Sequence, residues 1–185
     1  MKKILCIGDS LTNGARNEFY RDYPLELSEI FFKKLKKNVI CQNESVNGET
    51  SSEVLKRAIK LIPSEKFKCI LLLAGTNDSK IPIPLKIYER NISQIIRLAT
   101  FQNLKLFIGL LPNIYSGLPC YSILEGNKNI KNYNKILIKL ALRNKIKTCD
   151  FRNMSEKFYS DGVHFNYQGY LIMAQKWFEL IKNEI

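Results

Sequence analysis

Two reactive side chains stand near opposite ends of the sequence. Ser10 lies in the segment Gly8-Asp9-Ser10-Leu11, and His164, the only histidine of the chain, lies in Asp161-Gly162-Val163-His164. A serine becomes a nucleophile when an adjacent base, usually a histidine, takes its proton. An aspartate can hold that histidine in the correct tautomer. Ser10, His164 and Asp161 are therefore candidates for a catalytic triad, although a serine at this place also suits a helix N-cap.

Acyl transfer further requires hydrogen-bond donors for the oxyanion that forms during the reaction. Three candidates follow from the sequence: the backbone N–H of Ser10, the backbone N–H of Gly48 and the side-chain amide of Asn77. Glycine at position 48 allows a ligand to approach the backbone closely. The alternative for Asn77 and Asp78 is an ordinary turn, since both residue types favour turns.

Each of these candidates lies in a segment that follows an apolar run of strand length. The runs are Lys3–Ile7, Asn38–Gln42, Cys69–Ala74, Leu104–Leu110 and Ile146–Phe151. Ser10, Gly48 and Asn77 follow the first three runs, and Asp161 and His164 follow the last. Parallel strands bring their carboxyl ends to one edge of a sheet, where ligands bind in open α/β folds. The sequence therefore predicts that these distant residues meet in one cleft.

Segments with helical spacing of apolar residues alternate with these strands. They lie near residues 27–35, 51–62, 85–99, 130–141 and 167–181, while residues 112–127 show no periodicity. Alternating strands and helices predict βαβ units. The expected fold class is α/β, with a mostly parallel five-stranded sheet and helices on both faces. At 185 residues, without repeats or linkers, the chain is expected to form one domain over 1–185. Trp177 and the helical tyrosines are expected in the core.

The composition favours a globular protein of the cytoplasm. No apolar run approaches the roughly 18 residues of a membrane span. The apolar run after Met1 is too short for a signal peptide and ends at Gly8. The five cysteines are an odd number without a Cys-x-x-Cys pair, so neither a disulfide scaffold nor a metal site is expected. Buried free thiols fit a reducing cytoplasm.

The charge is strongly basic, with 29 Lys and Arg against 17 Asp and Glu and a net charge of +12. Such an excess can indicate a nucleic-acid partner. The basic residues are spread along the chain, however, and the densest cluster, at residues 33–37, closes a predicted helix, where cations are favourable. A solvated surface is the preferred interpretation, and no nucleic-acid partner is expected. The sequence gives no indication of the oligomeric state.

Taken together, four segments resemble the signature blocks of the SGNH, or GDSL, hydrolase family of esterases and lipases. They are Gly8-Asp9-Ser10-Leu11, Gly48, Gly75-Thr76-Asn77-Asp78 and Asp161-Gly162-Val163-His164, in the family's order and across nearly the whole chain. The resemblance implies a flavodoxin-like three-layer α/β/α sandwich and hydrolysis of an ester or thioester without a cofactor. It implies that Ser10 is the nucleophile, His164 the base and Asp161 its partner. Ser10, Gly48 and Asn77 would form the oxyanion hole.

The substrate is expected to be a small-molecule ester bound by the loops beside these segments. Candidate substrate-binding residues are Asp9, Arg16, Tyr20, Tyr115 and Tyr121. For Asp9, a brace of its own loop through backbone hydrogen bonds is the favoured role. Tyrosines among polar groups suit a short acyl group, such as acetyl, on a carbohydrate or similar small alcohol. The alternatives are a lysophospholipase or thioesterase for longer acyl chains, an acyltransferase, and a basic binding module with a vestigial site.

Overall fold

The computed structural model describes residues 2–116 and 122–185 of the chain. The strands are β1 (Lys2–Gly8), β2 (Val39–Asn43), β3 (Cys69–Leu73), β4 (Lys105–Leu110) and β5 (Thr148–Asp150). The helices are α1 (Ser10–Asn13), α2 (Tyr23–Leu35), α3 (Ser51–Leu61), α4 (Thr76–Lys80), α5 (Leu85–Phe101), α6 (Ile123–Arg143) and α7 (Tyr167–Ile181), with a short 3₁₀ helix at Glu156–Phe158. This architecture confirms the predicted α/β class.

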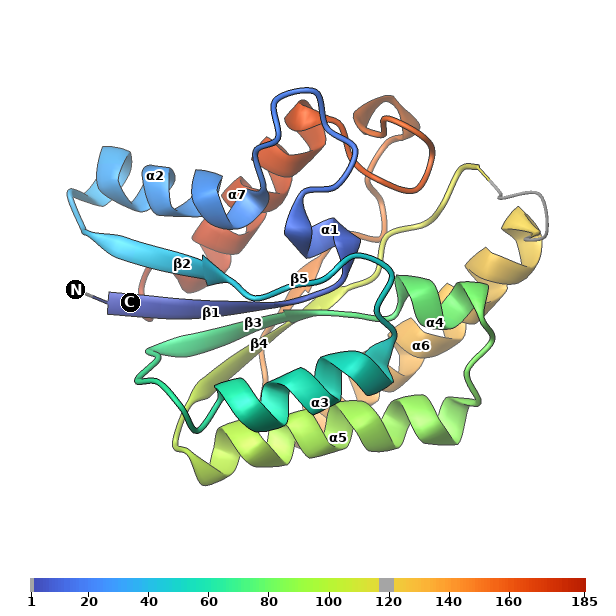
Figure 1. The fold of residues 1–185 in the computed structure, drawn as a ribbon, viewed down its shortest axis with the longest axis horizontal. Coiled ribbons are helices and arrows are strands. Elements are labelled where there is room, and N and C mark those ends of the chain that lie inside the picture. Colours follow the sequence, from blue (N-terminus) through green and yellow to red (C-terminus); the bar gives the residue numbers. More distant parts are fainter. Residues whose placement is uncertain (1, 117–121) are drawn as a thin grey trace.

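All five strands of the sheet are parallel and lie in the order β2-β1-β3-β4-β5. This is the flavodoxin-like order, in which the chain reverses its winding direction between β1 and β3. Helices α2 and α7 cover one face of the sheet, and α3, α5 and α6 cover the other (Figure 1). The short helices α1 and α4 begin beyond the carboxyl ends of the neighbouring strands β1 and β3, respectively. The predicted three layers are thus confirmed, and the central strand ends lie at the switch point where such folds bind ligands.

The core explains why the apolar runs of the sequence became central strands. Every residue of β3 is buried, as are the last five residues of β1. Trp177 of α7 is fully buried between Tyr23 of α2 and Phe151 after β5. The expectation that Trp177 packs in the core is therefore correct. Strands buried on both faces read as continuous apolar runs because helices cover both sides of a parallel sheet.

Helix α6 begins earlier than its apolar periodicity suggests, inside the segment expected to be irregular. Its first turn is exposed, so it carries no apolar pattern. Its inward face holds two asparagines that bind the loop after β4. Asn127 pairs with both backbone groups of Ile114 at 2.8–2.9 Å, and Asn134 pairs with both of Leu111 at 2.7–2.9 Å. Apolar spacing therefore does not predict the start of this helix, because a polar residue, Asn127, lies on its inner face there.

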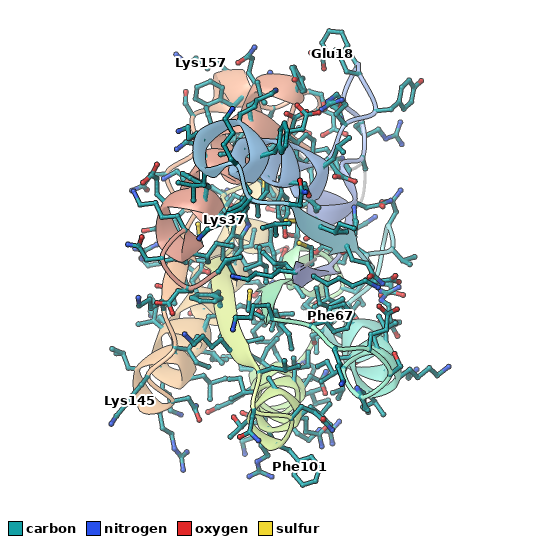
Figure 2. The ribbon with its side chains drawn as sticks, turned by 90° about the vertical axis from the view of Figure 1, so that its left-hand side faces the viewer. Glu18, Lys37, Phe67, Phe101, Lys145 and Lys157 are labelled. Atoms are coloured by element: carbon teal, nitrogen blue, oxygen red, sulfur yellow. The ribbon has the colours of Figure 1, made fainter. Side chains whose placement is uncertain are left out.

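Basic side chains are distributed over the whole molecule rather than gathered on one face. Figure 2 shows Lys157 and Lys145 at opposite ends of the molecule, with Lys37 between them. Several lysines pair with nearby acids, such as Lys105 and Lys147 with Glu184. This spread fits the expectation of a solvated basic surface.

Candidate active site

The first helix places Ser10 at the carboxyl end of β1. Asp9 is the N-cap of α1, and its carboxylate accepts the backbone N–H of Leu11 at 3.0 Å. Ser10 is the first residue of the helix and is 5% exposed. An N-cap aspartate satisfies a backbone donor that the helix leaves open. The serine predicted to be either a cap or a nucleophile is therefore not the cap, because Asp9 has that position.

The other end of the chain brings His164 to this serine. The Nε2 atom of His164 lies 3.0 Å from Ser10 Oγ, and its Nδ1 atom lies 2.8 Å from Asp161 Oδ2. With the proton on Nδ1, the ring donates to the carboxylate, and Nε2 is free to accept the serine proton. A continuous line of hydrogen bonds thus joins Ser10, His164 and Asp161 across 154 residues of sequence.

The loop that carries the histidine is held by its own backbone. Asp161 Oδ1 accepts the N–H groups of Val163 at 3.0 Å and His164 at 2.7 Å. The carbonyl of Gly162 accepts the N–H of Tyr115 at 2.7 Å. Gly162 has a φ of +80°, and a Cβ there would lie 2.5 Å from the backbone nitrogen of Ser116. A glycine is therefore required where the loop crosses the segment after β4.

Asp161 is kept ionised by its hydrogen bonds. Partial burial raises its pKa, but the N–H of His164, the imidazole of His164 and the N–H of Val163 outweigh that effect and lower the pKa below its usual value. Donors that point at a carboxylate favour its charged form. A negative charge beside Nδ1 is what an imidazole needs in order to become positively charged during proton transfer.

Two further segments reach the same edge of the sheet. Gly48 lies in the exposed loop between β2 and α3 with a φ of +82°, and nothing lies within 4 Å of the position of a Cβ there. Asn13, at the end of α1, donates to Asn47 Oδ1 at 2.9 Å. Asn77, in the first turn of α4, donates its side-chain amide to the carbonyl of Glu49 at 2.9 Å. These bonds tie the segments that hold the three predicted oxyanion donors to one another.

The predicted substrate-binding residues occupy different surroundings. Asp9 is fully buried, whereas Tyr20 is 95% exposed. Arg16 is also exposed and, like Tyr20, has a positive φ. Tyr115 is half-buried, stacks edge-on against an aromatic neighbour and donates its hydroxyl to the carbonyl of Met154 at 3.0 Å. Tyr121 lies outside the described residues. Arg16 and Tyr20 thus have free surface for a ligand, while Asp9 has none.

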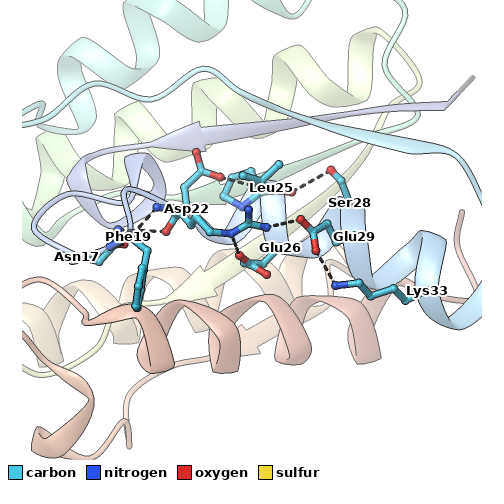
Figure 3. Close-up of polar contacts among 10 residues, drawn as sticks. Asn17, Phe19, Asp22, Leu25, Glu26, Ser28, Glu29 and Lys33 are labelled. Carbon is cyan, nitrogen blue, oxygen red and sulfur yellow. Dashed lines mark hydrogen bonds and ion pairs between the residues drawn. The ribbon is translucent and has the colours of Figure 1, made fainter.

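The loop between α1 and α2, which carries Arg16 and Tyr20, is firmly anchored. The side chain of Asn17 binds four backbone groups of the loop, from Gly14 to Arg21. Arg21 forms ion pairs with Glu26 and Glu29 of α2. Figure 3 shows these two acids beside Asn17 and Lys33. Glu29 in turn binds Lys33 at 2.7 Å. The exposed tip of this loop is therefore attached to a part of the loop that hydrogen bonds and ion pairs hold in place.

The pKa of Asp9 is shifted in the opposite direction from that of Asp161, because at Asp9 the effect of burial outweighs that of the hydrogen bonds. Burial raises the pKa of Asp9, the N–H of Leu11 partly opposes this, and the negative charge of Asp78 adds to the increase, so that the pKa is about 7. Asp78 is itself fully buried after β3 and accepts two hydrogen bonds from Ser51. Sequence reasoning missed this contact because Asp78 reads as a turn residue and Ser51 as an N-cap, 27 positions apart.

Neither a metal cluster nor a membrane span is found in the described part of the chain. No group of three or more His, Cys, Asp or Glu side chains there is placed to hold a metal ion. Of the helices described, none is long and apolar enough to cross a bilayer.

Comparison with known proteins identifies the family of the chain. The sequence profile of the GDSL-like lipase/acylhydrolase family matches residues 6–172. The chain belongs to this family. A match to a curated relative, an arylesterase of Vibrio mimicus, is 28% identical over 97 residues and covers 52% of this chain. The match spans about half of the length of that relative (48%).

Solved structures of GDSL proteins share the fold over nearly the full length. A lipase/acylhydrolase from Enterococcus faecalis superposes with a TM-score of 0.83 at 22% identity, covering 99% of this chain and 96% of that one. A mutant of a Geobacillus acetyl-xylooligosaccharide esterase superposes with a TM-score of 0.81 at 16% identity, covering 97% and 94%. At such low identity these similarities establish the fold alone.

Proposed function

We propose that this protein is a serine esterase that hydrolyses O-acyl esters through an acyl-enzyme on Ser10. The observation that carries the proposal is the line of hydrogen bonds from Ser10 Oγ to His164 (3.0 Å) and from His164 to Asp161 (2.8 Å). A nucleophile, a base and a group that orients the base are the three parts that acyl transfer requires. Membership of the GDSL-like lipase/acylhydrolase family supports the same chemistry.

The positions of these atoms support the following proposed reaction. Ser10 Oγ attacks the ester carbonyl while His164 Nε2 takes the serine proton. The proton then passes to the leaving alcohol, and the acyl group stays on Ser10. His164 next takes a proton from water, whose oxygen attacks the acyl-serine and releases the carboxylic acid. The proton returns to Ser10, so the enzyme is regenerated without a cofactor.

The backbone N–H groups of Ser10 and Gly48 and the amide of Asn77 are proposed to hold the oxyanion. Ser10 and Asn77 lie in the first turns of α1 and α4, and Gly48 lies in a loop bonded to both segments. Preorganised donors of this kind act where charge develops in the transition state. Removal of one such donor typically lowers kcat by about 10²–10³-fold.

The preferred substrate is a short acyl ester, such as an acetyl group on a carbohydrate or another small alcohol. Arg16 and Tyr20 are exposed on the anchored loop, and Tyr115 contacts the segment that holds His164. Polar and aromatic side chains of this kind suit a small amphipathic alcohol. The acetyl-xylooligosaccharide esterase of Geobacillus shows that the same fold can carry such a site. A lysophospholipase or thioesterase for longer acyl chains is the alternative.

Hydrolysis of p-nitrophenyl esters from acetate to laurate tests this proposal. We expect turnover of the short esters by the wild type and a loss of at least about 10³-fold in Ser10→Ala. Ser64→Ala is the matched control, because Ser64 is exposed and bonds only the carbonyl of Leu61 in its own turn. Equal activity of Ser10→Ala and wild type would exclude Ser10 as the nucleophile. Preference for laurate would favour the long-chain alternative.

A further inference from the structure

A buried polar cluster joins the segments that carry two of the proposed oxyanion donors. It consists of Asp78 of α4, Ser51 of α3 and Asn91 of α5, each 0–1% exposed. Asp78 Oδ2 accepts the backbone N–H of Ser51 at 2.8 Å, and Oδ1 accepts the hydroxyl of the same residue. Asn91 donates to Ser51 Oγ at 3.0 Å. A buried carboxylate is costly unless it is fully bonded, so a cluster this complete defines one geometry.

The two ends of this cluster adjoin two of the proposed oxyanion donors. Asp78 follows Asn77 in the first turn of α4, and Ser51 comes three residues after Gly48. A second bond runs parallel to the cluster, from the Asn77 amide to the carbonyl of Glu49. The segment after β2 and the segment after β3 are therefore joined twice, once by a buried carboxylate and once by the amide itself.

The hydrogen bond from the Asn77 side-chain amide to Glu49 determines which N–H donor of Asn77 remains for a substrate. A primary amide has two N–H donors. One N–H of Asn77 is used by the carbonyl of Glu49, which fixes the plane of the amide and leaves the second N–H for an oxyanion. If the segments moved apart, the amide would rotate with them.

We propose that Asp78 is a positioning residue, whose clamp on Ser51 keeps the Asn77 amide aligned with Gly48 for oxyanion binding. This inference rests on the proposed function, because it assigns Asn77 a role in ester hydrolysis. Asp78 touches no substrate and acts through its neighbour. Misplacement of a catalytic group by about 1 Å can lower a rate by about 10²-fold, so loosening the clamp is expected to affect kcat.

The test is a double-mutant cycle between Asp78 and Asn77, measured with p-nitrophenyl acetate. We expect Asp78→Asn to lower kcat by about 10- to 100-fold, with KM changed less than about twofold. In the Asn77→Ala background the same substitution is expected to lower kcat by less than about twofold, because the group it positions is absent. Equal losses in both backgrounds would show that Asp78 acts through general stability, and would overturn the inference.

Two further variants keep the test decisive if Asp78→Asn folds poorly. Ser51→Ala removes one hydrogen bond of the clamp but keeps the carboxylate and the Ser51 N–H, and Ser51→Thr restores the hydroxyl. We expect a kcat loss of about 5- to 10-fold in Ser51→Ala that Asn77→Ala cancels and Ser51→Thr restores. Ile96→Val, in the buried part of α5, is the control for destabilisation without a change in kcat.

The outcomes separate this inference from the proposed function. If wild type hydrolyses the ester, Ser10→Ala and Asn77→Ala lose activity as expected, and Asp78→Asn and Ser51→Ala match wild type, only the positioning role is wrong. If Asn77→Ala itself matches wild type, the oxyanion assignment and the positioning role both fail while the nucleophile stands. If Ser10→Ala matches wild type, the proposed function fails first.

Discussion

The two halves of the site are built in opposite ways. The strand-end half, Asp9 and Ser10 after β1 with Asp78 after β3, is at most 5% exposed and rests on the central strands. The loop half, Asp161 and His164, stands in an irregular segment, with side chains 41% and 21% exposed. The first half is fixed by packing. The second is fixed by hydrogen bonds of one loop to itself and to the segment after β4.

This difference sets the charge of the carboxylates in the two halves. Burial raises the pKa of Asp9 to about 7. For Asp161, hydrogen bonds outweigh partial burial and lower the pKa. Environments that move two pKa values apart allow two carboxyl groups to take different tasks at one pH. Near neutral pH, Asp161 is the fully charged partner for an imidazolium, whereas Asp9 is suited to hold the backbone.

The largest effect is expected from removing the base of the loop half. In His164→Ala, Ser10 keeps its place but loses the acceptor of its proton, and we expect kcat to fall by at least about 10⁴-fold. Because the ring is partly exposed and lies in a loop, the midpoint of urea unfolding should change little. Steady-state hydrolysis of p-nitrophenyl acetate, with urea unfolding as the control, measures both. A loss below tenfold would mean that another group deprotonates Ser10.

The sequence predicts the positions of the strand-end residues better than those of the substrate-binding residues in the loops. Apolar runs identify β1 and β3 because their residues are buried on both faces, and Ser10 and Asn77 follow directly. His164 is the only candidate for a histidine base, because the chain has no other histidine. The structure shows that Ser10 Oγ lies 3.0 Å from His164 Nε2. The chemical roles of the two residues stay predictions.

Contacts between ordinary polar residues far apart in the chain could not be predicted. Ser51 reads as a helix cap and Asp78 as a turn residue, so neither type nor spacing indicates that they pair. The start of α6 was missed for a related reason, because Asn127 near that start binds the backbone of Ile114 rather than apolar surface. Satisfaction of buried polar groups is a tertiary property.

A smaller loss of kcat is expected on substitution of Asp161, and it tests the tautomer of His164 specifically. In Asp161→Asn the side-chain oxygen should stay on the N–H groups of Val163 and His164, which turns the amide NH₂ toward the imidazole. The ring must then carry its proton on Nε2, where it cannot accept the serine proton. We expect kcat to fall by about 10³- to 10⁴-fold.

Asp161→Ala is the matched comparison, because it removes the carboxylate without imposing the wrong tautomer. Water can reach this half-exposed position, so we expect a loss of only about 10²-fold. Steady-state kinetics of both variants on one ester measure the difference. If Asp161→Ala is the less active variant, the carboxylate acts mainly by holding its loop, and the tautomer explanation is wrong.

For the strand-end half, the expected effect is on stability rather than on activity. Folding raises the pKa of Asp9 from 3.8 to about 7, so the folded protein binds this proton more tightly than the unfolded chain does. The resulting stabilisation is complete below about pH 4 and is lost as the pH rises through 7, by up to about 4 kcal/mol. Asp9→Asn stays neutral and should lack that decline, while its side-chain oxygen can still cap Leu11. Urea unfolding of both proteins at pH 4, 6 and 8 measures the two slopes. Parallel slopes in the two proteins would show that Asp9 already ionises near pH 4 in the folded protein and that the buried half tolerates its charge.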